Sequence, residues 1–506
     1  MKKIRLLILL CSFISIEPFA QQKGIIRIET GAISGAITAD GMITAYKGIP
    51  FAEPPVGELR WKAPRQAKSW QGVRSCTSFS ASPMQSAPVP FSMWSEEFLI
   101  PKEPIGEDCL YLNVWSGAKT SKEKKPVLVW IYGGGFRSGG SACPIYDGEA
   151  MARKGIIFVS INYRVGIWGF FAHPGLAAEN ERSGNFGLLD QIAALQWVKR
   201  NIAAFGGDPE QVTIAGQSAG SMSVNALVAS PLAKGLFNKA IAQSGANFTR
   251  GNPLQSVAEM EVGRSFQSLG ASSLTELRKI SSDELLKKAN GNYRPYIDGY
   301  VLPEHIADIF AKGQQNKVAL LTGWNQDEGL MMTPVKKAED YKADIYKRYG
   351  NNAKAMLTAY PGETDEQASQ SQLNLSRDQV FGLQNYLWSK AQAKQGLPVY
   401  VYRFTRIVPA TGEYKKFKAF HTGEVPYAYD NLKFVNRPWE EVDLRLARQM
   451  SDHWVNFIRT GDPNGKGLTS WPRFSEEKNG IMYFDAESHS GQMEDTSQLK
   501  ILEGTY

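Results

Sequence analysis

The chain has 506 residues, of which 43% are apolar and 21% charged, and its formal net charge is +7. This balance is typical of a globular protein and excludes the disordered and fibrous classes. So small a charge on so large a surface gives no argument for a nucleic-acid partner. No linker, repeat or low-complexity tract divides the chain, so we expect one large domain over residues 21–506.

The N-terminal segment predicts a cleaved signal peptide over residues 1–20. A basic start containing Lys2 and Lys3 precedes a short apolar core that ends at Ile16, and Ala20 precedes a plausible cleavage site. The apolar core is too short to span a bilayer, and no later stretch reaches the required length of about 20 apolar residues. We therefore expect an exported protein, periplasmic or secreted, with no stable membrane anchor.

Cleavage would leave three cysteines, Cys76, Cys109 and Cys143. In an oxidising compartment this odd number indicates one disulfide bridge and one spare thiol. The alternative is that all three are small buried apolar residues.

Five short apolar runs predict buried parallel strands. They cover residues 127–131, 156–161, 212–215, 318–322 and 399–404. Between them, apolar residues over 188–205 recur at three- and four-residue spacing, which predicts an amphipathic helix ending at Gly206. Strands alternating with helices indicate an α/β fold, with a large, mostly parallel sheet covered by helices on both faces. In such sheets, reactive residues gather at the carboxyl ends of the strands.

A strand-to-helix junction predicts the nucleophile. The strand expected at 212–215 leads into Gly216-Gln217-Ser218-Ala219-Gly220, and a helical pattern follows. A Gly-x-Ser-x-Gly sequence in this context is a nucleophile elbow, in which a tight turn exposes the serine hydroxyl. The following helix directs its N–H groups toward developing negative charge. We therefore predict that Ser218 attacks a carbonyl carbon.

The attack creates an oxyanion, which needs preorganised N–H donors. One donor should come from Ala219, directly after the nucleophile. The others should come from Gly134 and Gly135, because this glycine loop follows the strand expected at 127–131.

The serine needs a base, and the base needs an acid to orient it. In this type of fold the chain order is serine, acid, histidine. Among the histidines after Ser218, His453 falls in a helical pattern and His489 in a polar C-terminal stretch. His421 instead follows the strand expected at 399–404, in a loop that can reach across the strand ends, so we select it as the base.

The acid stays open at this point. Asp327 and Glu328 are adjacent and both follow the strand expected at 318–322, and Asp298 is a weaker third candidate. The local sequence does not choose between the adjacent pair.

The chain resembles the type-B carboxylesterase family, which includes the cholinesterases. The matching segments are KGIPFA at 47–52, EDCLYLN at 107–113, YGGGF at 132–136, NYR at 162–164, the elbow, DEG at 327–329, His421 with EVPY at 424–427, and TGDP at 460–463. The resemblance covers nearly the whole mature chain. It implies an α/β-hydrolase fold, hydrolysis of small-molecule esters through an acyl-enzyme, and no metal or organic cofactor.

The resemblance also implies residue roles. It makes Glu328 the acid and His421 the base, and it makes Ser244 a serine that supports both. Two scaffold ion pairs follow from it as well: Arg60 with Glu107, and Arg164 with Asp190.

Three departures from the family pattern concern the substrate and the cysteines. Gln217 stands where many relatives carry glutamate, which weakens the case for a cationic choline ester. Trp94 resembles the aromatic residue that binds quaternary ammonium in cholinesterases, but its spacing to Cys109 is too long, which favours a core or surface role. Cys76 replaces the expected first loop cysteine, so a Cys76–Cys109 bridge is a hypothesis.

Three rival functions use the same fold. A non-catalytic cholinesterase-like binding protein would lose a triad residue or an oxyanion glycine, and this chain retains all of them. A serine amidase or peptidase shares the acyl-enzyme chemistry, and a long-chain lipase would need a lid that the sequence does not show. The resemblance favours ester hydrolysis, and nothing in the sequence indicates an oligomeric state.

Overall fold

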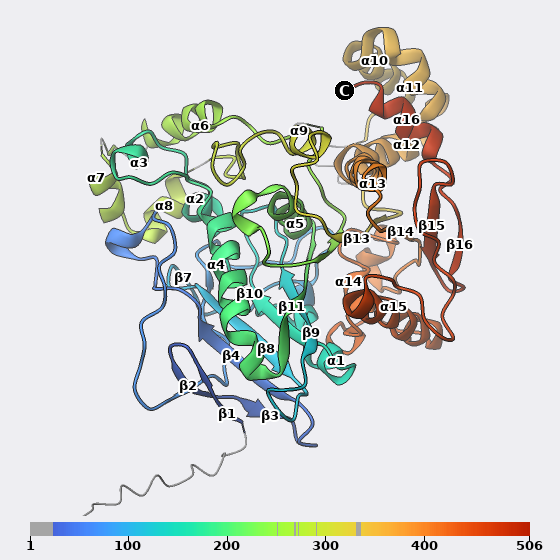
Figure 1. Ribbon diagram of the computed structural model, residues 1–506. Coiled ribbons are helices and arrows are strands. Elements are labelled where there is room, and N and C mark those ends of the chain that lie inside the picture. The colour runs from blue at the N-terminus through green and yellow to red at the C-terminus, as the bar shows by residue number, and fades with distance from the viewer. Residues whose placement is uncertain (1–23, 250, 268–269, 272, 290, 330–334) are drawn as a thin grey trace, which may run out of the picture.

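The computed structural model describes residues 24–249, 251–267, 270–271, 273–289, 291–329 and 335–506. The predicted signal peptide lies outside these residues. An eleven-stranded sheet runs through the molecule (Figure 1). Its spatial order is β16 (His489–Gln492), β15 (Gly480–Phe484), β14 (Val399–Phe404), β13 (Ala319–Asn325), β12 (Lys239–Gln243), β11 (Gly207–Gln217), β9 (Lys125–Ile131), β10 (Ile157–Ile161), β8 (Tyr111–Ser116), β4 (Thr44–Pro50) and β3 (Ala36–Ile37).

The strands from β15 to β10 are parallel, and the strands at both edges are antiparallel to their neighbours. Two small sheets lie outside this one: β1 (Ile25–Ile28), β2 (Gly31–Ser34) and β5 (Val73–Ser75) form the first, and β6 (Ser82–Pro83) and β7 (Ile105–Gly106) the second. Parallel strands bring all their carboxyl ends to one edge, which is where the candidate residues of the sequence fall.

Helices cover both faces of the sheet, as the alternating pattern predicts. Helices α4 and α5 pack on one face, in front of the strands in Figure 1, and α13 continues this layer over β13 and β14. Helices α1 and α15 pack against the other face. The helices are α1 (Glu149–Arg153), α2 (Gly166–Gly169), α3 (Gly175–Ala178), α4 (Phe186–Asn201), α5 (Ala219–Ala229), α6 (Gln255–Gln267), α7 (Leu274–Lys279), α8 (Ser282–Lys288), α9 (Ile306–Ala311), α10 (Ala338–Tyr349), α11 (Ala353–Ala359), α12 (Asp365–Arg377), α13 (Leu383–Lys394), α14 (Val425–Ala428), α15 (Glu441–Thr460) and α16 (Thr496–Glu503).

The five predicted strands are confirmed as β9, β10, β11, β13 and β14. The predicted helix over 188–205 is confirmed as α4 followed by a 3-10 turn, η4 (Ile202–Phe205), and it ends at Gly206, whose φ of 81° is left-handed. Strand β11 begins at Gly207, earlier than the apolar run suggests, and its register shifts before Val212. Pro209 lies in this irregular stretch, where it has no N–H to donate to a ladder.

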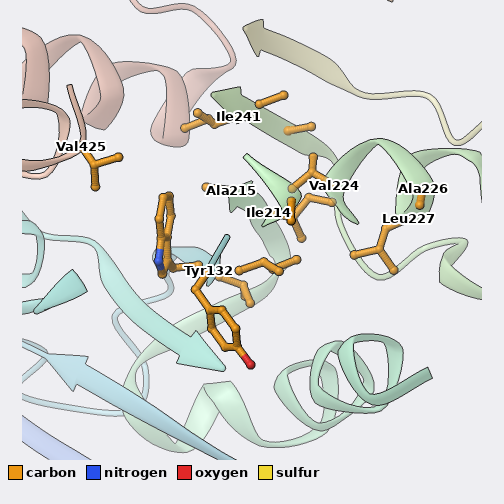
Figure 2. Packing of buried hydrophobic residues seen from close by; sticks show 14 of the residues in the cluster. Tyr132, Ile214, Ala215, Val224, Ala226, Leu227, Ile241 and Val425 are labelled. Atoms are coloured by element: carbon orange, nitrogen blue, oxygen red, sulfur yellow. The ribbon is translucent and has the colours of Figure 1, made fainter. Parts of the chain in front are cut away.

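The core is continuous across the sheet. Figure 2 shows Val224 and Leu227 of α5 beside Ile214 of β11, while Val425 of α14 lies on the other side of the strands. All four side chains are fully buried. This packing fixes β11 and α5 relative to one another, and therefore fixes the turn between them.

The predicted Cys76–Cys109 bridge is wrong, because both residues, and Cys143, are buried free thiols. Hydrogen bonds to Ser34 O and from Lys47 N–H hold the Cys76 backbone beside β2 and β4. Cys109 lies instead near the buried charges of Arg164 and Asp190, and burial raises the pKa of its thiol. The alternative reading, three buried thiols, is the one that the structure supports. Among the described residues, no helix is both long and apolar enough to cross a bilayer.

Candidate active site

Ser218 occupies the turn between β11 and α5. Its φ of 57° and ψ of −124° are outside the regions that most non-glycine residues adopt. The strained turn is held by a hydrogen bond from Ser218 N–H to Gln243 O at 2.9 Å and one from Met222 N–H to Ser218 O at 2.9 Å. Ser218 is half-buried while its neighbours Gln217 and Ala219 are buried, so the turn presents the serine outward, as the elbow motif predicts.

The glycines around the turn are required by close backbone contacts. A Cβ on Gly220 would lie 2.1 Å from Ile131 O, and one on Gly216 would lie 2.4 Å from the Gly220 carbonyl carbon. A Cβ on Gly133 would lie 2.6 Å from Gln217 O. The loop after β9 therefore passes directly against the elbow, which brings the two predicted motifs together.

Three backbone N–H groups near the serine donate no hydrogen bond within the described residues. Among the described residues, no hydrogen bond uses the N–H of Gly134, Gly135 or Ala219. Gly134 and Gly135 are exposed, with left-handed φ values of 112° and 62°, and Ala219 is the first residue of α5. Donors that have no internal acceptor are available to an external negative charge.

His421 and Glu328 lie together, and Gln217, the residue before Ser218, contacts the same imidazole. The imidazole Nδ1 is 2.7 Å from Glu328 Oε2, and both side chains are at most 2% exposed. Since a carboxylate only accepts, Nδ1 donates and Nε2 keeps its lone pair. The N–H of Asn325 donates to the other carboxylate oxygen at 2.8 Å, which fixes Glu328 at the end of β13.

The structure separates the two adjacent acid candidates. Asp327 exchanges backbone and side-chain hydrogen bonds with Ala419, so it holds the loop that leads to His421 without contacting the imidazole. Glu328 makes that contact. The third candidate, Asp298, accepts hydrogen bonds from the backbone N–H groups of Tyr300 and Leu302 in a turn.

Aromatic rings fix the plane of the imidazole. Phe381, in the π-turn η7 (Asp378–Gly382), stacks on His421 with ring centroids 4.5 Å apart and planes at 18°. The Trp94 ring meets the imidazole of His421 edge to face, with an angle of 87° between the ring planes and 6.1 Å between the ring centroids. Its Nε1–H donates to Thr422 Oγ1 at 3.1 Å. Trp94 therefore packs against the base, a place that its sequence spacing did not suggest.

A second buried carboxyl lies beside the pair, and the sequence reasoning assigned it no role. Glu424 is fully buried at the start of α14 and accepts from Asn325 Nδ2 at 2.5 Å and from Gln243 Nε2 at 3.2 Å. Burial and the nearby Glu328 raise the pKa of Glu424 to about 7. A glutamate three residues after His421 was visible in the sequence, but its burial was not.

Gln217 and Ser244, the two further residues that the sequence singles out beside the triad, differ in their contacts. Gln217 is buried, and its Nε2 lies 3.1 Å from His421 Nε2 and 3.4 Å from His421 Nδ1. Ser244 is also buried, but its hydroxyl has no hydrogen-bond partner among the described residues. Its N–H donates to Gly323 O at 2.8 Å, so Ser244 contributes its backbone to the contact between β12 and β13, and its hydroxyl makes no hydrogen bond to His421 or Glu328.

Both implied ion pairs are present. Arg60 Nε donates to Glu107 at 2.8 Å. Arg164 Nε and Nη2 donate to the two oxygens of Asp190 at 2.8 and 2.7 Å, and this second pair is at most 3% exposed. Two parallel bonds of this kind hold the segment after β10 against α4. In the described part of the chain, no group of three His, Cys, Asp or Glu side chains is placed to hold a metal ion.

Comparisons with known proteins point in one direction. Residues 22–501 match the model of the carboxylesterase family. The chain is 38% identical over 488 residues to the fumonisin B1 esterase of Sphingopyxis macrogoltabida, covering 92% of this chain and 87% of that protein. It is 35% identical over 488 residues to the para-nitrobenzyl esterase of Bacillus subtilis, covering 92% and 95%. A solved PNB esterase superimposes with a TM-score of 0.83 at 31% identity, over 95% of this chain and 99% of that one.

Proposed function

Because the chain belongs to the carboxylesterase family and hydrolyses carboxylic esters, we propose that Ser218 is its nucleophile, His421 its base and Glu328 its acid. The observation that carries this proposal is the buried 2.7 Å contact from His421 Nδ1 to Glu328 Oε2, made at an imidazole that also contacts Gln217, the residue directly before Ser218. That contact leaves Nε2 as the proton acceptor, which is the form that a general base requires.

The proposed reaction has two halves. As Ser218 Oγ attacks the ester carbonyl, its proton moves to His421 Nε2, and the Glu328 carboxylate stabilises the imidazolium. The N–H groups of Gly134, Gly135 and Ala219 bind the oxyanion. The C–O bond to the alcohol breaks, and the alcohol leaves with the proton from His421. Water then attacks the acyl-enzyme with His421 as base, which releases the acid and restores Ser218.

The assignment is tested by three substitutions, measured as kcat/KM on a p-nitrophenyl ester. Ser218→Ala should lose activity by at least about 10⁴-fold, and Glu328→Gln by roughly 10⁴-fold, because both remove members of one unit. Asp327→Asn is the matched control and should retain most activity, since Asp327 binds the backbone of Ala419. Full activity in Ser218→Ala would refute the assignment. A larger loss in Asp327→Asn than in Glu328→Gln would exchange the two acids.

Two finer proposals concern the location of the enzyme and its substrate. We propose that residues 1–20 are removed and that the protein is exported to the periplasm or medium, on the basis of the basic start and the apolar core. N-terminal sequencing of protein from each cell fraction tests this, and an intact Met1 in the medium or periplasm would refute cleavage. A panel of aryl, alkyl and choline esters with a peptide amide as control would define the preferred substrate.

A further inference from the structure

Arg137 carries a positive charge next to the glycine loop that faces the nucleophile. It is exposed and lies two residues after Gly135. Its N–H donates to Gly134 O at 3.1 Å, and a turn closed in this way keeps its first and fourth Cα atoms within about 7 Å. The same loop lies against the nucleophile, since a Cβ on Gly133 would be 3.0 Å from Ser218 Cβ. Arg137 therefore lies close to the place where Ser218 would hold an ester.

The core behind this turn holds its backbone in place. Phe136, the residue before Arg137, is buried, and its carbonyl oxygen accepts from Gly166 N–H at 2.7 Å. Its ring packs edge to face on Phe170, with 5.2 Å between the ring centroids. A cation on a fixed turn can recognise a negative charge at a set distance from the reacting carbonyl group.

No described carboxylate neutralises the guanidinium of Arg137. Its Nη2 donates to Gly291 O at 3.1 Å, and among the described residues Arg137 takes part in no ion pair. A carbonyl oxygen engages one of the several N–H donors of a guanidinium and leaves the others available. The positive charge of Arg137 is therefore available to a negatively charged ligand.

The segment that contains Gly291 carries a second guanidinium. Arg294 is half-buried, and its Nε is buried with no hydrogen-bond partner among the described residues. Gly291 and Arg294 line a small hollow with Phe170, and Glu261 of α6 is the one carboxylate among the described residues around it. With Arg137 bound to the rim of this hollow, two guanidinium groups lie near one carboxylate, so the described charges there sum to a positive value.

This inference rests on the nucleophile proposed above. We propose that Arg137 is a specificity-determining residue, which binds a carboxylate that the ester substrate carries at a distance from the scissile bond. The preferred substrates are then esters with a free carboxylate in their acid half or their alcohol half. A guanidinium suits this role, because it binds a carboxylate through two parallel N–H···O bonds. A contact remote from the reacting carbonyl stabilises bound substrate and transition state alike, so it should lower KM and leave kcat almost unchanged.

The test measures kcat and KM for two matched pairs of esters by titration of the released acid. Monoethyl adipate and ethyl hexanoate differ by a carboxylate in the acid half, and acetoxyhexanoate and hexyl acetate by one in the alcohol half. Arg137→Gln should lower kcat/KM for the anionic ester of at least one pair by roughly 10-fold, mainly through KM. Both neutral esters should change by less than about twofold. The pair that responds identifies the half that Arg137 reads. An equal loss for neutral and anionic esters, or no loss for either anionic ester, would overturn the proposal.

Arg473→Gln is the matched control. Arg473 is also exposed and its Nη2 also donates to a carbonyl oxygen, Gly396 O, at 2.7 Å. Gly396 precedes β14, so this arginine lies at the opposite edge of the parallel strands from the serine turn. The variant should hydrolyse all the esters as wild type does. A loss on the anionic esters as large as that of Arg137→Gln would show a general effect of surface charge and overturn the proposal.

Salt dependence gives a second measurement. Raising NaCl from about 0.02 to about 0.5 M should lower kcat/KM of wild type for the responsive anionic ester by several-fold, and that of Arg137→Gln much less. Equal salt dependence of the two proteins would overturn the proposal. If Arg137→Gln does not fold, as judged by its thermal transition, Arg137→Met replaces it with the same expected outcomes.

Ser218→Ala separates this inference from the assignment of the nucleophile. If Ser218→Ala is inactive on every ester while Arg137→Gln behaves as wild type does, the role of Arg137 alone is refuted. Retained activity in Ser218→Ala refutes the assignment of the nucleophile whatever the Arg137 variants show.

Discussion

Replacing Glu424 by glutamine should make the pH dependence of folding stability flatter. In the native protein this carboxyl is fully buried beside Glu328, and its pKa is raised from 4.5 to about 7. The unfolded chain exposes it to water, where it titrates near its ordinary value. Between about pH 4.5 and pH 7 the native state therefore binds more protons at this site than the unfolded state, so stability falls as pH rises.

The magnitude follows from the two pKa values. A displacement from 4.5 to about 7, at about 1.4 kcal/mol per pH unit, corresponds to about 3 kcal/mol. The penalty is absent below about pH 4.5 and complete above about pH 7. The glutamine side chain of the variant does not ionise, so this pH-dependent part disappears. The amide also disturbs the bonds from Asn325 and Gln243, but that loss is the same at every pH.

Urea titrations at pH 5, 6, 7 and 8 would measure the free energy of unfolding of both proteins. We expect the variant minus wild-type difference to be more positive at pH 8 than at pH 5, by up to about 3 kcal/mol. Glu413→Gln is the control, since Glu413 is exposed in a surface pair with Lys416. A Glu424→Gln difference that stays constant with pH, or that falls as pH rises, would refute the reasoning.

Two further substitutions test the scaffold. Gly220→Ala should abolish activity and lower Tm, because the added Cβ would lie 2.1 Å from the Ile131 carbonyl oxygen at the end of the neighbouring strand β9. Gly491→Ala is the control and should be neutral, since no atom would lie closer than 4.0 Å to its Cβ. A fully active Gly220→Ala would show that the turn can relax. Asp190→Asn should cost about 3–5 kcal/mol of stability, because it leaves the Arg164 guanidinium buried with a neutral partner. Glu284→Gln, in an exposed pair, should leave Tm unchanged, and equal Tm values for the two variants would contradict this account.

The nucleophile turn and the glycine loop were predictable because their requirements are local. Each motif directly follows a buried strand, and parallel strands bring their carboxyl ends to one edge. The contact of Gly133 with Gln217 O is the spatial consequence of β9 and β11 being neighbours. The sequence therefore predicts both motifs, and the parallel arrangement of the strands that precede them predicts that the motifs lie close together.

The acid was not predictable from the residues alone, because Asp327 and Glu328 share every local property that the sequence offers. Their difference arises from a contact across 93 positions, which is made when the loop after β14 folds back over β13. The extra methylene of glutamate reaches the imidazole, while Asp327 is bound to the backbone of that same loop. The resemblance selected Glu328, and the geometry offers a physical reason for that choice.

The cysteine hypothesis failed for a related reason. A bridge requires two Cβ atoms within about 4.5 Å, and sequence separation says nothing about that distance. Backbone hydrogen bonds to β2 and β4 hold Cys76 in place. Cys109 lies near the Arg164–Asp190 pair instead, so the two cysteines have different neighbours. The number of cysteines, taken with the predicted export, favoured a bridge but did not identify its two partners.

The groups around His421 include charged and neutral side chains. Glu328 Oε2 lies 2.7 Å from its Nδ1, Glu424 is a second buried carboxyl close by, and Gln217 Nε2 lies 3.1 Å from Nε2 and 3.4 Å from Nδ1. Protonating Glu424 as pH falls removes a negative charge near Glu328 and the imidazole. The activity of Glu424→Gln should therefore retain an acid limb at or below that of wild type, and a limb displaced to higher pH would show that Glu424 acts on the base mainly through its hydrogen bonds rather than its charge.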